Sequence, residues 1–161
     1  DIAGHEVTHG LTTMTAGLIY SMESGALNES FSDIFGASIE RFARPEEWNW
    51  LLGDDIGLTL RSLSNPNAYT DPDTYFGDYW ADLDGGDSGG VHTNSGVQNF
   101  WFYLLTEGGI GTNDNDDDYD VTGIDIEASS AIAFRNLTVY LTPSSNFAAA
   151  RFFAIESAVD L

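Results

Sequence analysis

The spacing of the apolar residues is the feature that most constrains what this chain can fold into. Near its start they recur with the period of an α-helix, at Ile2, Val7, Leu11, Met14 and Leu18. Comparable patterns predict helices over about residues 1–20, 27–43, 94–107, 125–141 and 146–161. Turn signals such as NPN, DPD and LDGGDSGG fill residues 53–90, and a loop of that length inside a domain is usually functional. The sequence therefore predicts a mostly α fold of about five helices around one long acidic loop.

The length and the apolar content of the chain fit one domain. With 42% hydrophobic and 13% aromatic residues, the chain can build a core and does not resemble a disordered acidic tail. A chain of 161 residues is expected to bury roughly 68–70% of its unfolded surface. We therefore expect residues 1–161 to form a single, mostly α-helical domain.

The charge balance is strongly acidic and excludes several classes of partner. The chain has 26 Asp and Glu against 5 Lys and Arg, a formal net charge of -21. A nucleic acid or an anionic membrane surface needs basic residues to neutralise it, so neither is an expected partner. No run approaches 18 apolar residues, so we expect no membrane span. The absence of cysteine excludes a disulfide framework and a thiolate site.

The stretch HEVTHG at residues 5–10 carries the first candidate chemistry. On a helix, residues four apart share a face, so His5 and His9 project together. Two imidazoles on adjacent turns suit a tetrahedral zinc ion. Glu6 points aside from the pair, where it could hold a zinc-bound water and take its proton. Because this pattern also occurs by chance, the alternative is a helix with two solvated or core histidines.

A carboxylate on the next predicted helix strengthens the zinc interpretation. Glu29 follows His9 after nineteen intervening residues. A turn between two antiparallel helices would return Glu29 to the level of the histidines as a third ligand, leaving the fourth position open for water. Asp33, one turn later, could accept a hydrogen bond from the other ring nitrogen of a ligand histidine. The alternative is a hydrated acidic stripe.

The third and last histidine lies at the end of the long loop, in GGDSGGVHTNSG. In a zinc hydrolase, a histidine outside the ligand set can hydrogen-bond the developing oxyanion, and His92 is the candidate. Asp87 could orient its ring. Taken alone, His92 could equally be a structural loop residue, but beside the zinc candidates we interpret it as catalytic.

These stretches resemble the thermolysin family of secreted bacterial neutral metalloproteases. HEVTHG, TAGLIYSMESGALNESFSDIFG and GGVHTNSG match the family pattern in order and spacing, and RSLSNPNAY and NLTVYLTPSSNFAAAR continue the match along nearly the whole chain. The resemblance implies the helical half of a thermolysin-like zincin catalytic domain. It also implies a secreted, extracellular zinc endopeptidase that cuts peptide and protein substrates before bulky hydrophobic residues.

The resemblance also implies a role for each matching residue. It makes His5, His9 and Glu29 the zinc ligands and Glu6 the general base. It implies that Tyr20 and His92 stabilise the oxyanion and that Arg61 binds a substrate carbonyl. It also implies that Asn28 binds substrate, and that Ile2 and Leu60 line an apolar pocket for the substrate residue that follows the cleaved bond. From the residues alone, Arg61 could equally form a surface ion pair and Tyr20 could be a core aromatic.

Calcium is a further expectation from the resemblance. It implies one structural calcium ion with oxygen ligands from Asp1, Glu40, Asn49 and Asp54. Leu51 stands where members with two calcium ions have glutamate, so one ion is expected rather than two. The acidic run at residues 112–120 resembles the start of an EF-hand but lacks its central glycine and closing glutamate. We interpret that run as a solvated loop.

Members of the family carry two parts that this chain does not match. One is an N-terminal, mostly β domain that forms the other wall of the cleft, and the other is a final helix after the position of ESAVDL. The resemblance therefore implies that these residues are part of a larger enzyme, lacking pieces at both ends. The N-terminal domain would be a partner of the chain, and activity of this chain alone is uncertain.

Two other functions stay open. The first is a zinc aminopeptidase with a similar helix pair, although such enzymes typically have one residue fewer between the second histidine and the glutamate. The second is a non-catalytic, calcium-stabilised module with a vestigial zinc site. Intact Glu6 and His92 argue against the second, because a decaying site usually loses such residues first.

Overall fold

A computed structural model describes all 161 residues, and six α-helices dominate it. They are α1 (Ile2–Met14), α2 (Met22–Ala43), α3 (Gly86–Asn94), α4 (Gly96–Glu107), α5 (Ile126–Arg135) and α6 (Phe147–Asp160). The strands are short: β1 (Leu51–Leu52), β2 (Arg61–Ser62), β3 (Gly108–Thr112) and β4 (Asp118–Thr122). The predicted mostly α fold is confirmed. None of the helices combines the length and apolar character needed to cross a membrane.

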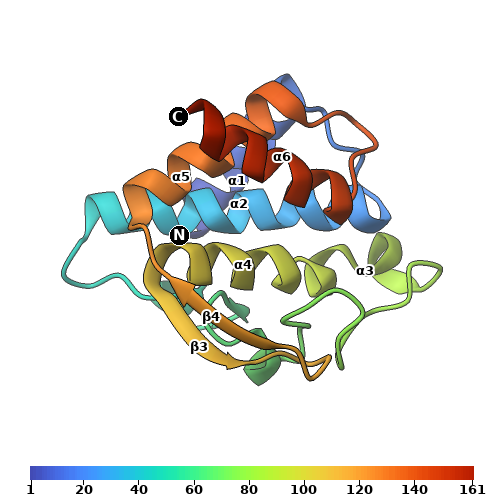
Figure 1. Ribbon diagram of the computed structural model, residues 1–161, viewed down its shortest axis with the longest axis horizontal. Coiled ribbons are helices and arrows are strands. Elements are labelled where there is room, and N and C mark those ends of the chain that lie inside the picture. Colours follow the sequence, from blue (N-terminus) through green and yellow to red (C-terminus); the bar gives the residue numbers. More distant parts are fainter.

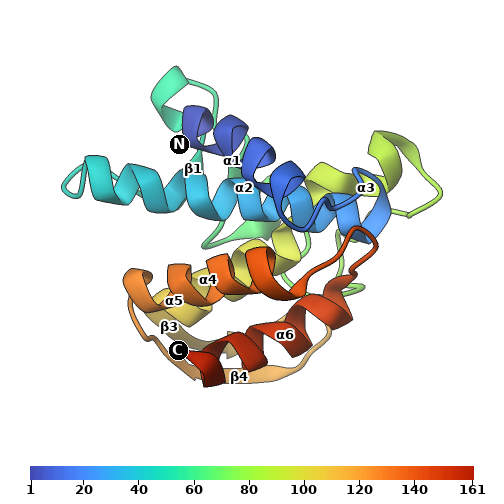
Figure 2. The same ribbon diagram turned by 90° about the horizontal axis from the view of Figure 1, so that it is seen from above.

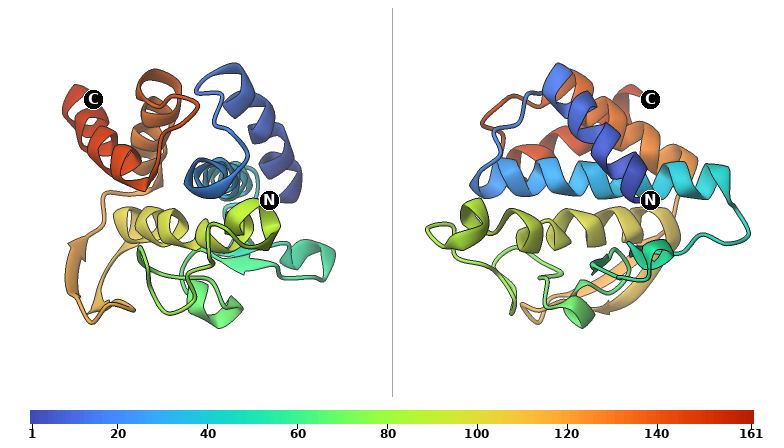
Figure 3. Two further views of the ribbon diagram at one scale, coloured as in Figure 1. Left: turned by 90° about the vertical axis from the view of Figure 1, so that its right-hand side faces the viewer. Right: turned by 180° about the vertical axis from the view of Figure 1, so that it is seen from behind.

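Helix α2 is the centre of the molecule. It packs against α1, α3, α4, α5 and α6, and Figure 3 shows it nearly end-on with the other helices around it. In Figure 1 it runs across the middle of the molecule, with α4 below it and α5 and α6 above. Its side chains are buried on almost every side, and the core around it includes Leu27, Phe31, Ile34, Phe102 and Leu137. A helix buried in this way is held by tertiary packing more than by its own propensity.

Helices α1 and α2 approach one another closely because glycines face each other at their crossing. A Cβ added to Gly4 would lie 3.1 Å from the Cα of Gly36. A Cβ added to Gly36 would lie 2.9 Å from the carbonyl oxygen of Asp1 and 3.2 Å from the nitrogen of His5. Seen from above, α1 lies along α2 on the side away from α4, α5 and α6 (Figure 2). Backbones this close let side chains of the two helices contact one another directly, as His5 and Asp33 do.

The boundaries of the first two helices differ from the prediction. Helix α1 ends at Met14 rather than near residue 20, because the chain turns at Gly17, which has a left-handed φ of 63°. Helix α2 begins at Met22, and the stretch MESG forms its first turn instead of a break. Gly25 is needed there, since a Cβ on it would lie 2.5 Å from a methyl carbon of Val91.

The later segments differ from the prediction in smaller ways. Residues 53–90 are mostly turns, as predicted, with two 3₁₀ turns at Asp54–Ile56 and Pro66–Tyr69. The acidic run at 112–120 is a hairpin rather than a plain loop, because β3 and β4 pair antiparallel with Thr112 opposite Asp118. Alternation explains the strand, since Tyr119 and Val121 are half-buried between exposed neighbours. The pattern predicted over 125–141 divides into α5 and a π turn at Asn136–Tyr140.

Candidate metal centre and active site

Three side chains from α1 and α2 converge as the sequence predicts. The ligand atoms of His5, His9 and Glu29 all lie within 4.8 Å of one another. The two Nε2 atoms are 3.1 Å apart, and the Glu29 carboxylate oxygens lie 3.6 Å from the Nε2 of His5 and 3.4 Å from that of His9. Ligands of a tetrahedral zinc ion, at bond lengths near 2 Å, are separated by about 3.3 Å. The donor set therefore fits a zinc ion.

An unpartnered oxygen at the same point supports this fit. Glu29 is 1% exposed, and its Oε2 is a buried atom with no hydrogen-bond partner. The guanidinium of Arg61 lies 3.5 Å away at Nη2 without making a hydrogen bond, so a metal ion bound at this oxygen would compensate its burial more fully. Elsewhere in the chain, no other group of three or more histidine or acidic residues converges in this way.

The outer ring nitrogens of the two histidines are held by α2. Nδ1 of His5 lies 2.7 Å from Oδ1 of Asp33, and Nδ1 of His9 lies 2.8 Å from Oδ1 of Asn28. Because these oxygens accept a hydrogen bond from Nδ1–H, each ring presents its Nε2 lone pair to the centre. Asn28, predicted to bind substrate, is buried, and its Nδ2 donates to the carbonyl of Leu18 at 3.1 Å. Both the oxygen and the nitrogen of its amide are therefore hydrogen-bonded within the protein.

Asp33 is the most enclosed carboxylate of the site. It is 0% exposed, yet its pKa lies well below its usual range. Burial alone would raise that pKa, but the charge of Arg61 and the hydrogen bonds from His5 and Arg61 lower it further than burial raises it. Asp33 therefore stays ionised behind His5.

Arg61, on β2, is buried beside Asp33. Its Nε and Nη2 donate to the two carboxylate oxygens of Asp33, each at 2.8 Å, and Nη2 lies 3.5 Å from Oε2 of Glu29. Burial alone would lower the pKa of Arg61, but the charge of Asp33 raises it, so the guanidinium stays charged. These hydrogen bonds to Asp33 use Nε and Nη2 and do not involve Nη1. Of the two residues predicted to line the apolar pocket, Ile2 is half-buried and Leu60 is 43% exposed.

Tyr20, His92 and Asp87 form a chain of contacts at the open side of the site. Asp87 accepts hydrogen bonds from both the backbone nitrogen and Nδ1 of His92, at 2.9 and 2.6 Å. The Nε2 of that ring lies 3.2 Å from the hydroxyl of Tyr20, which donates to Oε1 of Glu29. Burial raises the pKa of Tyr20, and the hydrogen bond and charge of Glu29 raise it further. Tyr20 therefore remains a protonated donor. The general-base candidate Glu6 is exposed on α1, directly after His5.

A left-handed turn at the start of α3 places Asp87 against His92. Residues 87–90 all have positive φ, from 53° to 87°. Asp87 and Ser88 are not glycines, and such strain is typical of functional sites. No larger residue fits at Gly89, since a Cβ there would lie 2.6 Å from the carbonyl oxygen of Leu83. The hydrogen bonds from His92 hold the pKa of Asp87 below its usual value, although partial burial would raise it.

The residues predicted to bind calcium are partly satisfied by protein donors. Asp1 accepts from the backbone nitrogen of Gly53, and Asn49 donates to Asp54 at 2.7 Å. Arg44 forms ion pairs with Glu40 and Asp55, so a guanidinium already lies among these carboxylates. The other oxygen of Glu40 is buried without a hydrogen-bond partner. The acidic oxygens do not converge as the zinc ligands do, and calcium binding here stays a prediction.

Three residues near the site were not predicted from the sequence. Asn99 on α4 and Ser30 on α2 are 0% exposed and hydrogen-bonded to one another behind Asp33. Asp71 is 6% exposed, and burial raises its pKa to about 7, with the charge of Arg61 opposing the shift and that of Asp33 adding to it. The only signal in the sequence was an amide pair, Gln98–Asn99, inside the aromatic stretch of α4.

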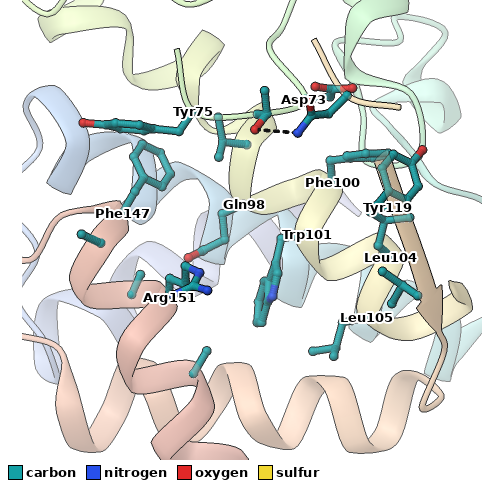
Figure 4. A pocket seen from close by; sticks show the side chains of 17 residues that line it. Asp73, Tyr75, Gln98, Phe100, Trp101, Leu104, Leu105, Tyr119, Phe147 and Arg151 are labelled. Carbon is teal, nitrogen blue, oxygen red and sulfur yellow. Dashed lines mark hydrogen bonds between the residues drawn. The ribbon is translucent and has the colours of Figure 1, made fainter. Parts of the chain in front are cut away.

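An apolar cavity lies away from this site. It has a volume of about 630 Å³ and is lined mostly by apolar residues of α4, α6 and the β3–β4 hairpin (Figure 4). Trp101, Leu104, Tyr119 and Phe147 are among its walls, with Arg151 at one side. None of the residues predicted for catalysis, metal or substrate binding lines it.

Known proteins resemble this chain along its whole length. A family model described as "Thermolysin metallopeptidase, alpha-helical domain" matches residues 16–161. A bacillolysin of Brevibacillus brevis is 47% identical over 167 aligned residues, and a thermolysin of Alicyclobacillus acidocaldarius subsp. acidocaldarius is 44% identical. Each alignment covers 100% of this chain and 29% of the relative, so the chain spans less than a third of the length of those proteins.

A solved structure agrees with the sequence matches. The precursor of protealysin, a metalloproteinase from Serratia proteamaculans, superposes with a TM-score of 0.77 at 29% sequence identity. The superposition covers 99% of this chain and 51% of that one.

Proposed function

This chain belongs to the thermolysin metallopeptidase family as its α-helical domain, and on that basis we propose that it supplies the zinc site of an endopeptidase. The observation that carries the proposal is the convergence of His5, His9 and Glu29, with a buried Glu29 oxygen that accepts no hydrogen bond. A zinc ion bound by these residues would polarise the substrate carbonyl and acidify the attacking water. The remaining chemistry belongs to side chains of this chain.

Glu6 is the general base and then the general acid. It accepts a proton from the water whose oxygen forms a bond to the carbonyl carbon of the scissile peptide. When the carbon–nitrogen bond breaks, Glu6 passes that proton to the leaving amine. Its exposed position on α1, next to a metal ligand, supports this role, because a base must reach both the water and the substrate.

Tyr20 and His92 stabilise the negative charge that develops on the carbonyl oxygen. The raised pKa of Tyr20 keeps its hydroxyl proton available for donation. His92 presents Nε2 to the same oxygen, and the carboxylate of Asp87 at Nδ1 orients the ring. The Tyr20 hydroxyl donates to Oε1 of Glu29, beside the metal ligands, which supports a position close to the reacting carbonyl.

Substrate positioning falls to residues beside the site. We propose that Arg61 uses its Nη1 to bind a backbone carbonyl of the substrate, while Asp33 holds the rest of its guanidinium. Ile2 and Leu60 would contact the residue after the cut, which favours a bulky apolar side chain. Because the chain covers 29% of its relatives, activity on peptides and proteins is proposed for the whole protein, which we expect to be secreted and extracellular.

Replacing the general base tests this function. In the whole protein, Glu6→Gln should lower kcat/KM on an internally quenched, N-terminally blocked peptide by about 10²–10⁴-fold. The zinc content, measured by atomic absorption, should stay at one ion per chain, because Glu6 is not a ligand. Glu156→Gln, an exposed glutamate on α6, is the matched control and should keep wild-type activity.

Two results would contradict the proposal. Activity that survives Glu6→Gln with zinc bound would exclude this mechanism. Wild-type activity confined to peptides with a free N-terminus would instead identify an aminopeptidase.

A further inference from the structure

A buried amide on α4 hydrogen-bonds the carboxylate of Asp33, which in turn contacts the candidate zinc ligand His5. Asn99 is 0% exposed, and its Nδ2 donates to Oδ2 of Asp33 at 2.8 Å. Its Oδ1 accepts from the hydroxyl of Ser30, also at 2.8 Å, and that hydroxyl oxygen accepts from Nε2 of Gln98 at 3.2 Å. A flipped amide would point its oxygen at the Asp33 carboxylate, so only one orientation is favourable.

Asn99 completes the hydrogen bonding of the carboxylate that holds His5. Oδ1 of Asp33 contacts Nδ1 of His5 and Nη2 of Arg61, at 2.7 and 2.8 Å. Oδ2 accepts from Nε of Arg61 and from Nδ2 of Asn99, each at 2.8 Å. All four acceptor positions of the carboxylate are then filled. Without Asn99, the carboxylate of Asp33 could rotate together with the guanidinium of Arg61.

We propose that Asn99 is a positioning residue for the zinc ligand His5, acting through Asp33. The inference rests on the proposed zinc site. Burying an amide inside the aromatic face of α4 costs free energy unless its bonds compensate. Its bond to Asp33 is a bond to a fully buried charge, which is the stronger kind. Through it, α4 sets the plane of the carboxylate and thus the direction in which the imidazole presents Nε2.

The neighbouring amide supplies a matched control. Gln98 is 5% exposed on the same helix and also bonds Ser30, but it does not contact Asp33. Asn99→Leu and Gln98→Leu therefore each remove a buried amide of α4, and only the first removes a donor from Asp33. A merely structural role would make the two variants alike in zinc affinity.

The test measures zinc affinity in the whole protein by competition with a chromophoric chelator. Asn99→Leu should raise the zinc dissociation constant about tenfold, the lower end of the range for residues that support a metal ligand. Gln98→Leu should change it by less than about twofold. Asn99→Leu should also lower the thermal stability of the metal-free protein more than Gln98→Leu does, because it removes a hydrogen bond to a buried charge, so zinc affinity is compared at a temperature where both variants are folded. In the zinc-loaded protein, the Nδ1–H proton resonance of His5 should move in the first variant only.

A second variant covers the case in which Asn99→Leu does not fold. Ser30→Ala frees the Oδ1 of Asn99 and also removes the bond of Gln98, so its difference from Gln98→Leu isolates the Ser30–Asn99 contact. It should weaken zinc binding more than Gln98→Leu does. Equal zinc affinity in wild type and the Asn99 variant, or equal losses in the two leucine variants, would overturn the inference. A wild-type protein that binds no zinc would instead overturn the proposed function itself.

Discussion

At the scale of single residues, two carboxylates of the site are each tied to a basic partner. Asp33 faces Arg61, and Asp87 faces His92, and in both carboxylates these contacts hold the pKa down. Asp71 is the exception, since burial raises its pKa to about 7 despite the charge of Arg61. Ionisation of Asp71 therefore lowers the free energy of unfolding.

Asp71→Asn should make the protein more stable in alkaline solution. The folded-state pKa of about 7 lies above the value of 3.8 for an unperturbed aspartate. The stabilisation from a protonated Asp71 is thus complete below pH 3.8 and is lost as the pH rises through 7. At pH 8 the variant should gain about 1–2 kcal/mol in urea unfolding, discounted for partial solvent screening, with little gain at pH 4.

An exposed aspartate controls for the change in net charge. Asp84→Asn removes the same charge from the long loop and should change the free energy of unfolding by less than about 0.5 kcal/mol. An equal gain at pH 4 and pH 8 in the Asp71 variant would show that ionisation is not the cause.

At the scale of elements, the site depends on how closely α1 and α2 cross. The ligands come from both helices, and Gly4 and Gly36 let the backbones meet. A helix pair held apart by one methyl group would separate His5 from Glu29. The two glycines thus help to set the geometry of the candidate metal site, because they determine how closely the helices that carry its ligands approach each other.

Gly36→Ala should weaken both the fold and the site. Its Cβ would lie 2.9 Å from the carbonyl oxygen of Asp1, which forces α1 outward. We expect a loss of about 1–3 kcal/mol in the free energy of unfolding, measured by thermal denaturation, and weaker zinc binding. Gly10→Ala is the control on α1, because no atom lies within 4 Å of its added Cβ. That variant should gain about 0.5–1 kcal/mol from helix propensity. Equal effects of the two substitutions would argue against the close crossing.

The same elements show what could be predicted from sequence. His5, His9 and Glu29 were predictable because helical spacing and one short turn determine their relation. Asp87 and His92 were also accessible, since only five positions separate them. Asn99 was not, because its partners Ser30 and Asp33 lie on a helix more than 60 residues earlier, and only the packing of α4 on α2 unites them. The start of α2 was missed because Gly25 looked like a break, whereas it permits the contact with Val91.

At the scale of the whole molecule, acidic groups far outnumber basic ones. The net charge is -21, and three of the five arginines, Arg44, Arg61 and Arg135, already pair with carboxylates. The remaining acidic groups repel one another across the surface, and this repulsion opposes the folded state. Dissolved ions screen such repulsion over about 10 Å at 0.1 M salt.

Salt should therefore stabilise the molecule. Raising sodium chloride from about 20 mM to about 0.5 M should add about 1 kcal/mol, which corresponds to a rise in Tm of roughly 2–4 °C for a chain of this size. Differential scanning calorimetry at constant pH would measure it, with sucrose at matched osmolality as an uncharged control. A fall in Tm with salt would mean that ion pairs such as Arg135–Asp160 outweigh the repulsion.

The short connection between α1 and α2 has a consequence for the order of folding. Only residues 15–21 join the two helices, so little loop entropy is lost when His5, His9 and Glu29 meet. The groups that orient and assist them arrive from much later in the chain: Arg61, His92 and Asn99. Because local contacts form fastest, we expect this helical hairpin to gather the candidate metal ligands before β2, α3 and α4 pack onto it. On that order the proposed zinc ion would bind early, and the groups that orient and assist its ligands would arrive afterwards.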